Sequence, residues 1–466
     1  MSVPIRDSRV GRGRESDAAA LIARLERVPF SRWHMKARLV MGSATFFDAY
    51  NALSLAFALP ILVGTWHISP AGIGFLIAAG YAGQLLGALL FGGLAEKYGR
   101  VPSAAAAVAI MSVMSLGCAL AGNFQALLAC RLVQGVGVGG EMPVAAAYIN
   151  ELSTARGRGR FFLMYEMIFP IGLMFTGQIG SWLVPVLGWK IMFLIGGIPG
   201  LFITLLVARL PESPRWLISK GRLSEAGAIV KNLEASTKHR LPTIKATPEN
   251  IPAVRYSTVP MRRGAWTEVL SGFYRGRTLI AWTLWASAFF IANGLNNWLP
   301  TLYTTVYHLG LKESLRAAAM TNVAQVAVLL ICAFCIDRVG RRIWTVASFM
   351  VGGALLAVLG LVAAKSVLSV MILGTWSYGV IGSANAVLYL YTPEIYPTRI
   401  RAIATGLATS WLRLGSAVAP ALVGVMVGAT GINSVFWMFA GVSMVGALAA
   451  TRMVETRGRR LEEIAP

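Results

Sequence analysis

Charged side chains stand inside several long apolar stretches of this chain, where burial in a bilayer is costly. An unpaired charge near the bilayer centre costs between about 3 and over 10 kcal/mol, so each one needs a function or a partner. Arg413, in TSWLRLGSAVAP, carries a planar guanidinium that matches a carboxylate in two hydrogen bonds. We predict that Arg413 binds an anionic substrate. The alternative is a structural arginine that is paired permanently with a carboxylate on another helix.

Buried carboxylates are the second kind of candidate, because they can take up and release a proton. Asp48 lies deep in the first apolar stretch, in ATFFDAYNALSLAFALP, and Glu141 lies in GGEMP of the fourth. A desolvated carboxylate beside an aqueous cavity can titrate near neutral pH. No histidine falls inside an apolar stretch, so these carboxylates must carry any proton. Glu166, early in the fifth stretch, is predicted to pair with a gate arginine.

The seventh apolar stretch, FFIANGLNNWLPTLY, supplies neutral polar and aromatic groups. Amides that hydrogen-bond beside a flat indole suit a small planar ring. We therefore predict substrate contacts from Asn293, Asn296, Asn297 and Trp298. Asn293 has an alternative role, which is to cap a helix break at Gly294. Gln178 in the fifth stretch and Tyr389 in the tenth are weaker candidates for the same site.

Helices must position these groups, since the apolar stretches are long enough to cross a bilayer. Of the 466 residues, 56% are hydrophobic and 13% are charged, and a soluble protein would carry roughly twice that charged fraction. The stretches reach the length of about 20 residues that a spanning helix needs. They begin near Arg38, Ala71, Pro102, Phe124, Phe161, Trp189, Thr278, Ser314, Ile343, Val367, Ala402 and Ile432. The predicted fold class is an all-α membrane protein with twelve transmembrane helices.

Two motifs recur with one spacing, which indicates a duplicated chain. GGLAEKYGR around Glu96 returns as CIDRVGRR around Asp337, 241 residues later. INELSTARGRGR around Glu151 returns as TPEIYPTRIR around Glu394, 243 residues later. Duplicated membrane bundles are typical of transporters. We therefore predict two pseudo-symmetric six-helix halves, over residues 38–209 and 278–455, joined by a linker over residues 210–277.

Basic residues mark one side of the membrane. The net charge is +22, but the basic clusters alternate with the spans and lack an aromatic platform, which argues against nucleic-acid binding. By the positive-inside rule, both termini are cytoplasmic, in a 1–37 arm and a 456–466 tail. The polar start excludes a cleavable signal peptide, and we expect a monomer in the inner membrane, in contact with membrane lipids. The linker contains no phosphate loop, so we expect no cofactor, no ATP drive and no enzyme activity.

Five motifs together carry a family resemblance: GGLAEKYGR, RLVQGVGVGGEMP, PESPRWL, PEIYPTRIRA and ETRGRRLEEI. They resemble the major facilitator superfamily, and within it the sugar-porter-like branch. That branch includes sugar porters, organic ion transporters, synaptic vesicle glycoproteins and bacterial metabolite/proton symporters such as niacin transporters. The resemblance covers residues 38–464. It implies two halves that rock about a central site and open it alternately to each side.

The resemblance also suggests roles for single residues. In organic ion transporters of this branch, the position of Arg413 tends to be basic in anion carriers. Arg131 resembles the fourth-helix arginine that modulates the proton-carrying acid, and the alternative is a static ion pair between Arg131 and Asp48. Related symporters often carry a second aspartate where this chain has Asn51, and an amide cannot cycle a proton. Phe289 stands near the place where sugar porters have paired glutamines, which weakens a hexose as substrate.

Charged residues at the basic ends of the helices are predicted to form cytoplasmic gates. A carboxylate at a helix end can hold an arginine of the following turn and so latch the closed state. The alternative is a set of solvated turns that only obey the positive-inside rule. The predicted gate residues are Glu96, Arg100, Glu151, Asp337, Arg341, Glu394 and Arg399.

These observations predict a secondary active transporter that works by alternating access. We expect it to import a small organic monocarboxylate, aromatic or heterocyclic, such as niacin, together with a proton. Asn51 leaves an uncoupled facilitator of a sugar or other small metabolite as an alternative. A membrane sensor that does not transport is the alternative from another class.

Overall fold

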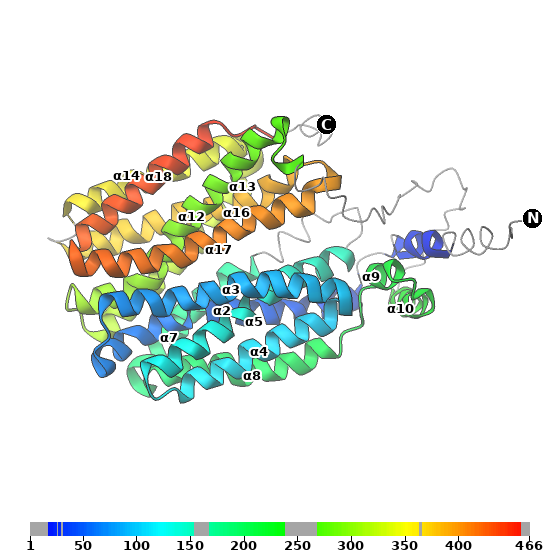
Figure 1. The fold of residues 1–466 in the computed structure, drawn as a ribbon, viewed down its shortest axis with the longest axis horizontal. Helices are drawn as coiled ribbons and strands as arrows, with labels where there is room; N and C mark the ends of the chain where they lie inside the picture. Colours follow the sequence, from blue (N-terminus) through cyan, green and yellow to red (C-terminus); the bar gives the residue numbers. More distant parts are fainter. Residues whose placement is uncertain are drawn as a thin grey trace, which may run out of the picture.

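The computed structural model describes residues 17–25, 27–28, 31–152, 167–237, 268–362 and 366–457, and the statements below concern these residues. Within them the chain folds into helices and contains no strand. The helices form two bundles that lie side by side, the first from α2 to α8 and the second from α12 to α18 (Figure 1).

The first bundle contains the helices before the linker. They are α2 (Arg32–Trp66), α3 (Pro70–Tyr98), α4 (Arg100–Leu120), α5 (Phe124–Leu152), α7 (Ile168–Leu187) and α8 (Lys190–Ala208). The first helix thus begins at Arg32, before the predicted start of the first span at Arg38. The predicted start of the fifth span, near Phe161, and Glu166 lie outside the described residues.

The second bundle repeats this arrangement. It contains α12 (Gly272–Thr305), α13 (Leu311–Val339), α14 (Arg341–Val362), α15 (Val367–Ser369), η2 (Val370–Gly374), α16 (Thr375–Glu394), α17 (Thr398–Ala429) and α18 (Ile432–Thr451). The π-helical segment η2 joins α15 to α16, and together they form one span over Val367–Glu394.

Eleven helical spans of the described chain are long and apolar enough to cross a membrane. The twelfth long helix of the two bundles is α5, which carries Arg131 and Glu141 and is therefore less apolar. It packs along α3 and α4 inside the first bundle. The prediction of twelve membrane helices in two six-helix halves is confirmed.

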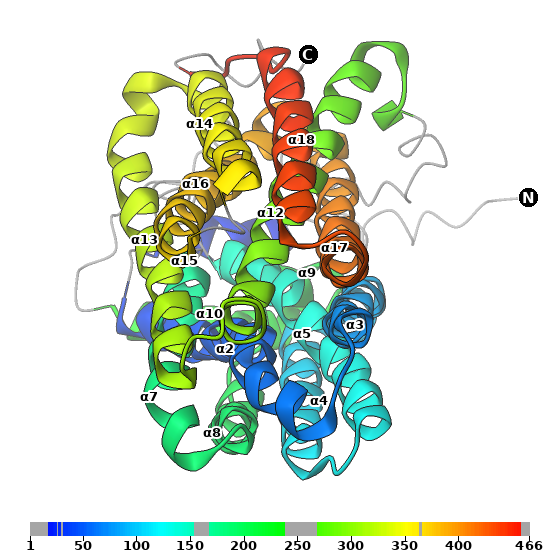
Figure 2. The same ribbon diagram turned by 90° about the vertical axis from the view of Figure 1, so that its left-hand side faces the viewer.

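The halves meet chiefly along three helix pairs, α3 with α17, α7 with α13 and α2 with α12. We call the end of the bundle near α9 and α10 the linker end, and the opposite end the far end. The halves converge at the far end, which faces the viewer in Figure 2. There Gly74 faces the backbone of Pro420 so closely that an added Cβ atom would lie 2.6 Å from the Pro420 carbonyl oxygen. The Pro70 carbonyl similarly leaves no room for a side chain at Gly424.

The linker begins with two helices, α9 (Pro214–Ser219) and α10 (Leu223–Ala235). A helix over residues 17–25 docks on them: Leu25 packs near Val230, and Arg24 forms a bidentate ion pair with Glu234 at 2.7 and 3.0 Å. The hydrogen bond from Arg24 lowers the pKa of Glu234.

Helix α9 in turn is tied to the first bundle. The Trp216 indole donates to the Glu96 carbonyl oxygen at 3.2 Å, and Arg215 Nε donates to the Glu151 carbonyl oxygen at 2.9 Å. One connected unit is therefore formed by the helix over residues 17–25, α9, α10 and the helix ends of the first half.

Candidate functional site

Arg413 lies on α17, where this helix faces the first half of the molecule. Its guanidinium is buried, and it donates to the Thr409 carbonyl oxygen of its own helix at 3.3 Å and to the Gly139 carbonyl oxygen of α5 at 3.5 Å. The Nε atom has no hydrogen-bond partner, and no described carboxylate forms an ion pair with Arg413. Arg413 is thus a buried cation without a direct ion pair to any carboxylate of the described residues.

Asp48 lies on α2 and is also buried, with 2% of its surface exposed. Its Oδ1 atom has no hydrogen-bond partner in the described part of the chain. Two charged groups act on this carboxylate: Glu141 of α5 repels its negative charge, and Arg413 attracts it. Asp48, Glu141 and Arg413 therefore belong to one electrostatic cluster, built from α2, α5 and α17.

Glu141 is tied to the same turn of α2 that carries Asp48. The Thr45 hydroxyl, three residues before Asp48, donates to Glu141 Oε1 at 2.9 Å. Two buried carboxylates that repel one another are stabilised when one of them holds a proton. A proton on either carboxylate would relieve this repulsion.

Arg131 lies elsewhere, inside the first half. It donates to the Asn51 carbonyl oxygen at 3.1 Å and to Gln134 Oε1 at 2.6 Å. Asn51 Oδ1 accepts from Gln134 Nε2 at 2.9 Å and from the Ser115 hydroxyl at 2.8 Å. The static ion pair between Arg131 and Asp48 is not formed, because neutral groups hold the guanidinium. Asn51 is the centre of this network.

The asparagines of α12 connect helices. Asn293 Oδ1 accepts from the Tyr81 hydroxyl of α3 at 2.9 Å, and Asn297 donates to the same hydroxyl at 2.9 Å. Asn293 also donates to Ser416 at 2.7 Å, whereas Asn296 bonds to partners within the second half. Since α12 runs unbroken through Gly294, Asn293 does not cap a helix break. These amides hold the two halves together in this state.

The aromatic groups divide into a packing residue and a wall. Trp298 is fully buried and donates to the Pro420 carbonyl oxygen at 3.1 Å, so it packs α12 against α17. Tyr389 acts electrostatically on Arg413, and its ring meets the Trp285 ring edge-on with 4.6 Å between centroids. Phe289 stacks on Trp285 at 5.5 Å. The aromatic wall is thus Tyr389, the neighbour of Arg413, with Phe289 next to it and the buried Trp285 packed against both rings. The sequence had indicated only Tyr389 as a contact.

Gln178 on α7 is a further polar group inside the bundle. Its Nε2 atom is buried and has no hydrogen-bond partner among the described residues. An amide donor of this kind is available to a ligand, which agrees with its place among the predicted substrate contacts.

The predicted gate residues form two matching clusters at the linker end. Arg100 bonds to Glu96 at 2.7 Å and to Glu151 at 2.8 Å in the first half. In the second half, Arg341 bonds to Asp337 at 3.1 Å and to Glu394 at 3.5 Å, the residues that occupy the matching positions of the repeat. Each cluster lies within one half. The side chain of Arg399 lies outside the described part.

Two carboxylates that the motif analysis missed complete these clusters. Glu212 accepts hydrogen bonds from the backbone N–H groups of Arg100 and Val101, and Glu455 does the same for Arg341 and Arg342. Each carboxylate therefore caps the N-terminus of a helix, α4 or α14. Burial raises the pKa of Glu212, although the backbone N–H groups oppose this shift.

The spacing of these caps repeats the duplication. Glu212 and Glu455 are 243 residues apart, the same spacing as Glu151 and Glu394, and this signal was available in the sequence. The glycines before the capped helices, Gly99 and Gly340, have φ angles of 115° and 96°. A side chain there would be strained and would meet the capping carboxylate.

Two matched six-helix halves that cross a membrane, with buried charges gathered where they meet, define a secondary transporter of the major facilitator type. The family model of the sugar (and other) transporter family matches residues 40–466. The chain belongs to this family, and its relatives are transporters rather than enzymes.

Individual relatives cover nearly the whole chain. The niacin transporter NiaP of Acinetobacter baylyi is 33% identical over 447 residues, which are 95% of this chain and 99% of that protein. The benzoate transport protein of the same organism is 26% identical over 421 residues, 88% and 86% of the two chains. The inward-open structure of the xylose transporter XylE from E. coli matches with a TM-score of 0.71 at 18% identity, over 92% of this chain and 99% of that one. This last likeness concerns the fold.

Proposed function

We propose that this protein imports a small aromatic or heterocyclic monocarboxylate, such as niacin, together with a proton. The observation that carries the proposal is the buried Arg413 guanidinium, which no described carboxylate neutralises. Asp48 attracts this charge without forming an ion pair with it, so a substrate carboxylate can still bind the guanidinium directly through two parallel hydrogen bonds. A neutral sugar offers no such charged partner.

The aromatic wall beside Arg413 supports a ring-shaped substrate. Tyr389 and Phe289 are partly exposed and lie side by side, with 6.5 Å between ring centroids, so a planar ring can pack against them while its carboxylate reaches Arg413. The names of two relatives, a niacin transporter and a benzoate transport protein, agree with this substrate class. Gln178 supplies an amide donor for a ring nitrogen or a second oxygen.

Asp48 and Glu141 carry the proton in this proposal. Protonation of one carboxylate relieves their repulsion, and the remaining negative charge faces Arg413. A substrate anion that binds Arg413 weakens its hold on Asp48, which favours protonation of Asp48. Binding of the anion and binding of the proton therefore assist one another, as symport requires.

Alternating access follows from the contacts between the halves. The bonds from Tyr81 to Asn293 and Asn297 join the halves toward the far end, and they must break before that end opens. Basic residues concentrate at the linker end, so the positive-inside rule places this end and both termini in the cytoplasm. We propose that the protein resides in the bacterial inner membrane as a monomer, with residues 210–277 as the cytoplasmic linker between its halves.

Uptake by proteoliposomes tests the substrate assignment. Purified protein is reconstituted, and uptake of labelled niacin, benzoate and xylose is compared under an inward proton gradient. Arg413→Ala should abolish uptake of the carboxylates while expression stays normal. Arg413→Lys should recover little of it, because an ammonium lacks the planar fork. Arg316→Ala, which removes an exposed arginine of α13, is the matched control.

The outcome separates the alternatives. Near-normal carboxylate uptake by Arg413→Ala contradicts the role of this arginine. Uptake of xylose without a response to the proton gradient identifies an uncoupled sugar facilitator instead. No uptake of any tested solute, by a protein that still binds niacin, favours a sensor.

A further inference from the structure

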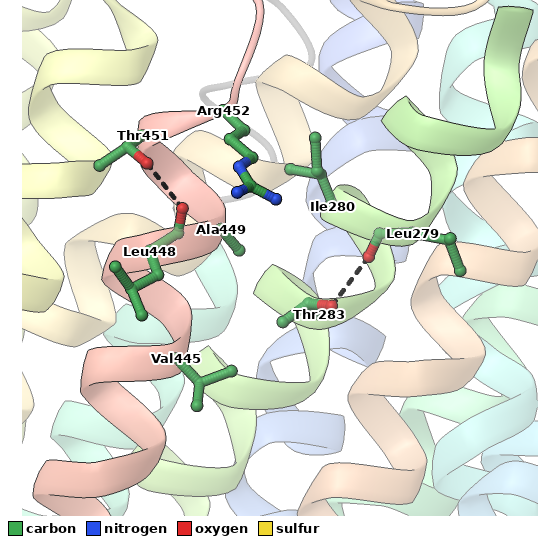
Figure 3. A pocket seen from close by; sticks show the side chains of 8 residues that line it. All are labelled: Leu279, Ile280, Thr283, Val445, Leu448, Ala449, Thr451 and Arg452. Atoms are coloured by element: carbon green, nitrogen blue, oxygen red, sulfur yellow. Dashed lines mark hydrogen bonds between the residues drawn. The ribbon is translucent and has the colours of Figure 1, made fainter.

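A groove runs along the outside of the second half, between α12 and α18 at the linker end. It encloses a cavity of about 390 Å³, and its walls include Leu279 and Thr283 of α12 and Val445 and Leu448 of α18 (Figure 3). The wall residues face outward, since Val445 is 52% exposed and Leu448 61%. In a membrane, this surface meets lipid.

A second hollow lies further along the same face of α12, since Ser287 and Phe290 follow Ile280 and Thr283 by seven residues. It encloses about 220 Å³ and is lined by Ser287 and Phe290 of α12, Trp411 of α17 and Val442 of α18. Leu279 and Phe290 lie eleven residues apart on α12, which corresponds to about 16 Å along a helix. One leaflet of the hydrocarbon core is about 15 Å thick. The combined groove therefore has the length of a lipid chain within one leaflet.

The mouth of the groove is cationic. Arg452, the residue that ends α18, lies at the mouth and extends toward Ile280 of α12 (Figure 3). It is exposed, and no described carboxylate forms an ion pair with it. Arg275 lies one turn before Leu279 on α12, on the same side of this helix. Among the described residues, none that lines the two hollows is acidic.

We propose that this groove binds an anionic phospholipid from the leaflet at the linker end. The lipid phosphate binds Arg452, whose guanidinium fork matches phosphate oxygens, and one acyl chain lies along the apolar walls of α12 and α18. Basic pockets between membrane helices on the cytoplasmic side bind such headgroups. Three features favour a lipid over a protein segment as the occupant. The groove has the length of a lipid chain, its walls face outward, and its charge lies at headgroup depth.

The groove lies on a helix that also contacts the other half. α12 forms one wall of the groove, and the same helix carries Asn293 and Asn297, which bond to Tyr81 of the first half. A lipid in the groove therefore contacts the outer face of α12, while the inner face of α12 bonds to the first half. The proposal does not depend on the identity of the transported solute.

Native mass spectrometry of the detergent-solubilised full chain tests the site. The protein is titrated with dioleoyl phosphatidylglycerol or dioleoyl phosphatidylcholine, and the fraction with one bound lipid is measured. The wild type should retain phosphatidylglycerol about tenfold more strongly than phosphatidylcholine. Arg452→Gln should remove most of this preference, and Arg338→Gln, an exposed arginine of α13 at the same end, should keep it.

A second variant tests the acyl chain. Val445→Trp fills the groove without changing charge, and it should weaken phosphatidylglycerol binding about as much as Arg452→Gln does. Val351→Trp, at a similarly exposed position of α14, is its control and should bind as the wild type. Equal binding of both lipids by the wild type overturns the proposal, as does equal binding by Arg452→Gln and Arg338→Gln. Unchanged binding by Val445→Trp overturns the placement of the chain in the groove.

Discussion

Arg131 and Arg413 are both buried guanidiniums inside the membrane bundle, yet their surroundings differ. Arg131 donates to Gln134 at 2.6 Å and to the Asn51 carbonyl at 3.1 Å, and both partners belong to its own half. The bonds of Arg413 are longer, 3.3 and 3.5 Å, and the longer one crosses to Gly139 of the other half. The Nε atom of each guanidinium lacks a hydrogen-bond partner among the described residues, so the two arginines differ in the length of their other bonds and in which half supplies the acceptors.

The difference separates structure from function. When all hydrogen-bond acceptors of a buried cation lie within one half, its surroundings stay the same while the other half moves. Such a cation has a structural role. A cation that lies between the halves changes its surroundings whenever they move, and a ligand can supply what its partners lack. Position relative to the moving interface, more than burial, therefore distinguishes a binding arginine from a structural one.

The largest expected effect concerns the acid that acts with Arg413. Asp48→Asn should abolish uphill accumulation of substrate under an inward proton gradient, because an amide cannot release a proton. Exchange of labelled for unlabelled substrate should persist, since it needs no net proton transfer. Both assays are run on the same vesicles. Full accumulation by this variant would assign the proton to Glu141 alone, and a wild type without any response to the gradient would indicate uniport.

The second prediction compares the two arginines directly by thermal unfolding in detergent. Arg131→Met removes two hydrogen bonds from a charged donor, each worth about 1.5–3 kcal/mol, so its Tm should fall clearly. Arg413→Met removes a buried charge that has only long hydrogen bonds and no direct ion pair among the described residues, so its Tm should stay or rise although transport is lost. If both variants lose the same amount of Tm, the distinction between a structural Arg131 and a binding Arg413 is contradicted.

A smaller effect is expected at the contact between the halves. Tyr81→Phe removes two hydrogen bonds to α12, each of about 1 kcal/mol, and should shift the protein toward the state with the far end open. A cysteine at buried Leu59, in a background without the four native cysteines, should then react about tenfold faster with a water-soluble maleimide. Tyr98→Phe, at an exposed tyrosine, should leave the rate unchanged. An unchanged rate in Tyr81→Phe would show that these bonds do not hold the far end closed.

The smallest effect is expected at the ion pairs of the linker end. Glu96 and Asp337 are 67% and 83% exposed, and exposed ion pairs contribute at most about 1 kcal/mol each. Glu96→Gln with Asp337→Asn should shift the protein modestly toward the state with the linker end open. Cysteines in the last turns of α16 would become slightly more reactive. If reactivity at both ends stays the same, these carboxylates only mark topology.

The energetic cost of buried charge explains what the sequence could predict. Asp48, Glu141 and Arg413 stood out because few functions justify a charge in an apolar span, and the structure brings them into one cluster. The asparagines of α12 did not reveal their partners, because a polar residue in a helix bonds to whatever faces it, and sequence does not show which helix that is. For Glu212, the sequence did contain a signal, which is its spacing from Glu455. Its capping role could not be predicted, because that role depends on the fold.

The contacts of α9 and α10 attach the first part of the linker to the first half. Through Arg24, α10 holds the N-terminal helix, and through Trp216, α9 holds the end of α3, so the first part of the linker travels with the first half. The chain that connects α10 to α12 is therefore shorter than residues 210–277, and a shorter connection confines the relative motion of its ends to a smaller volume. Changes in the length of the chain between α10 and α12 should consequently alter the rate of rocking without touching the binding site.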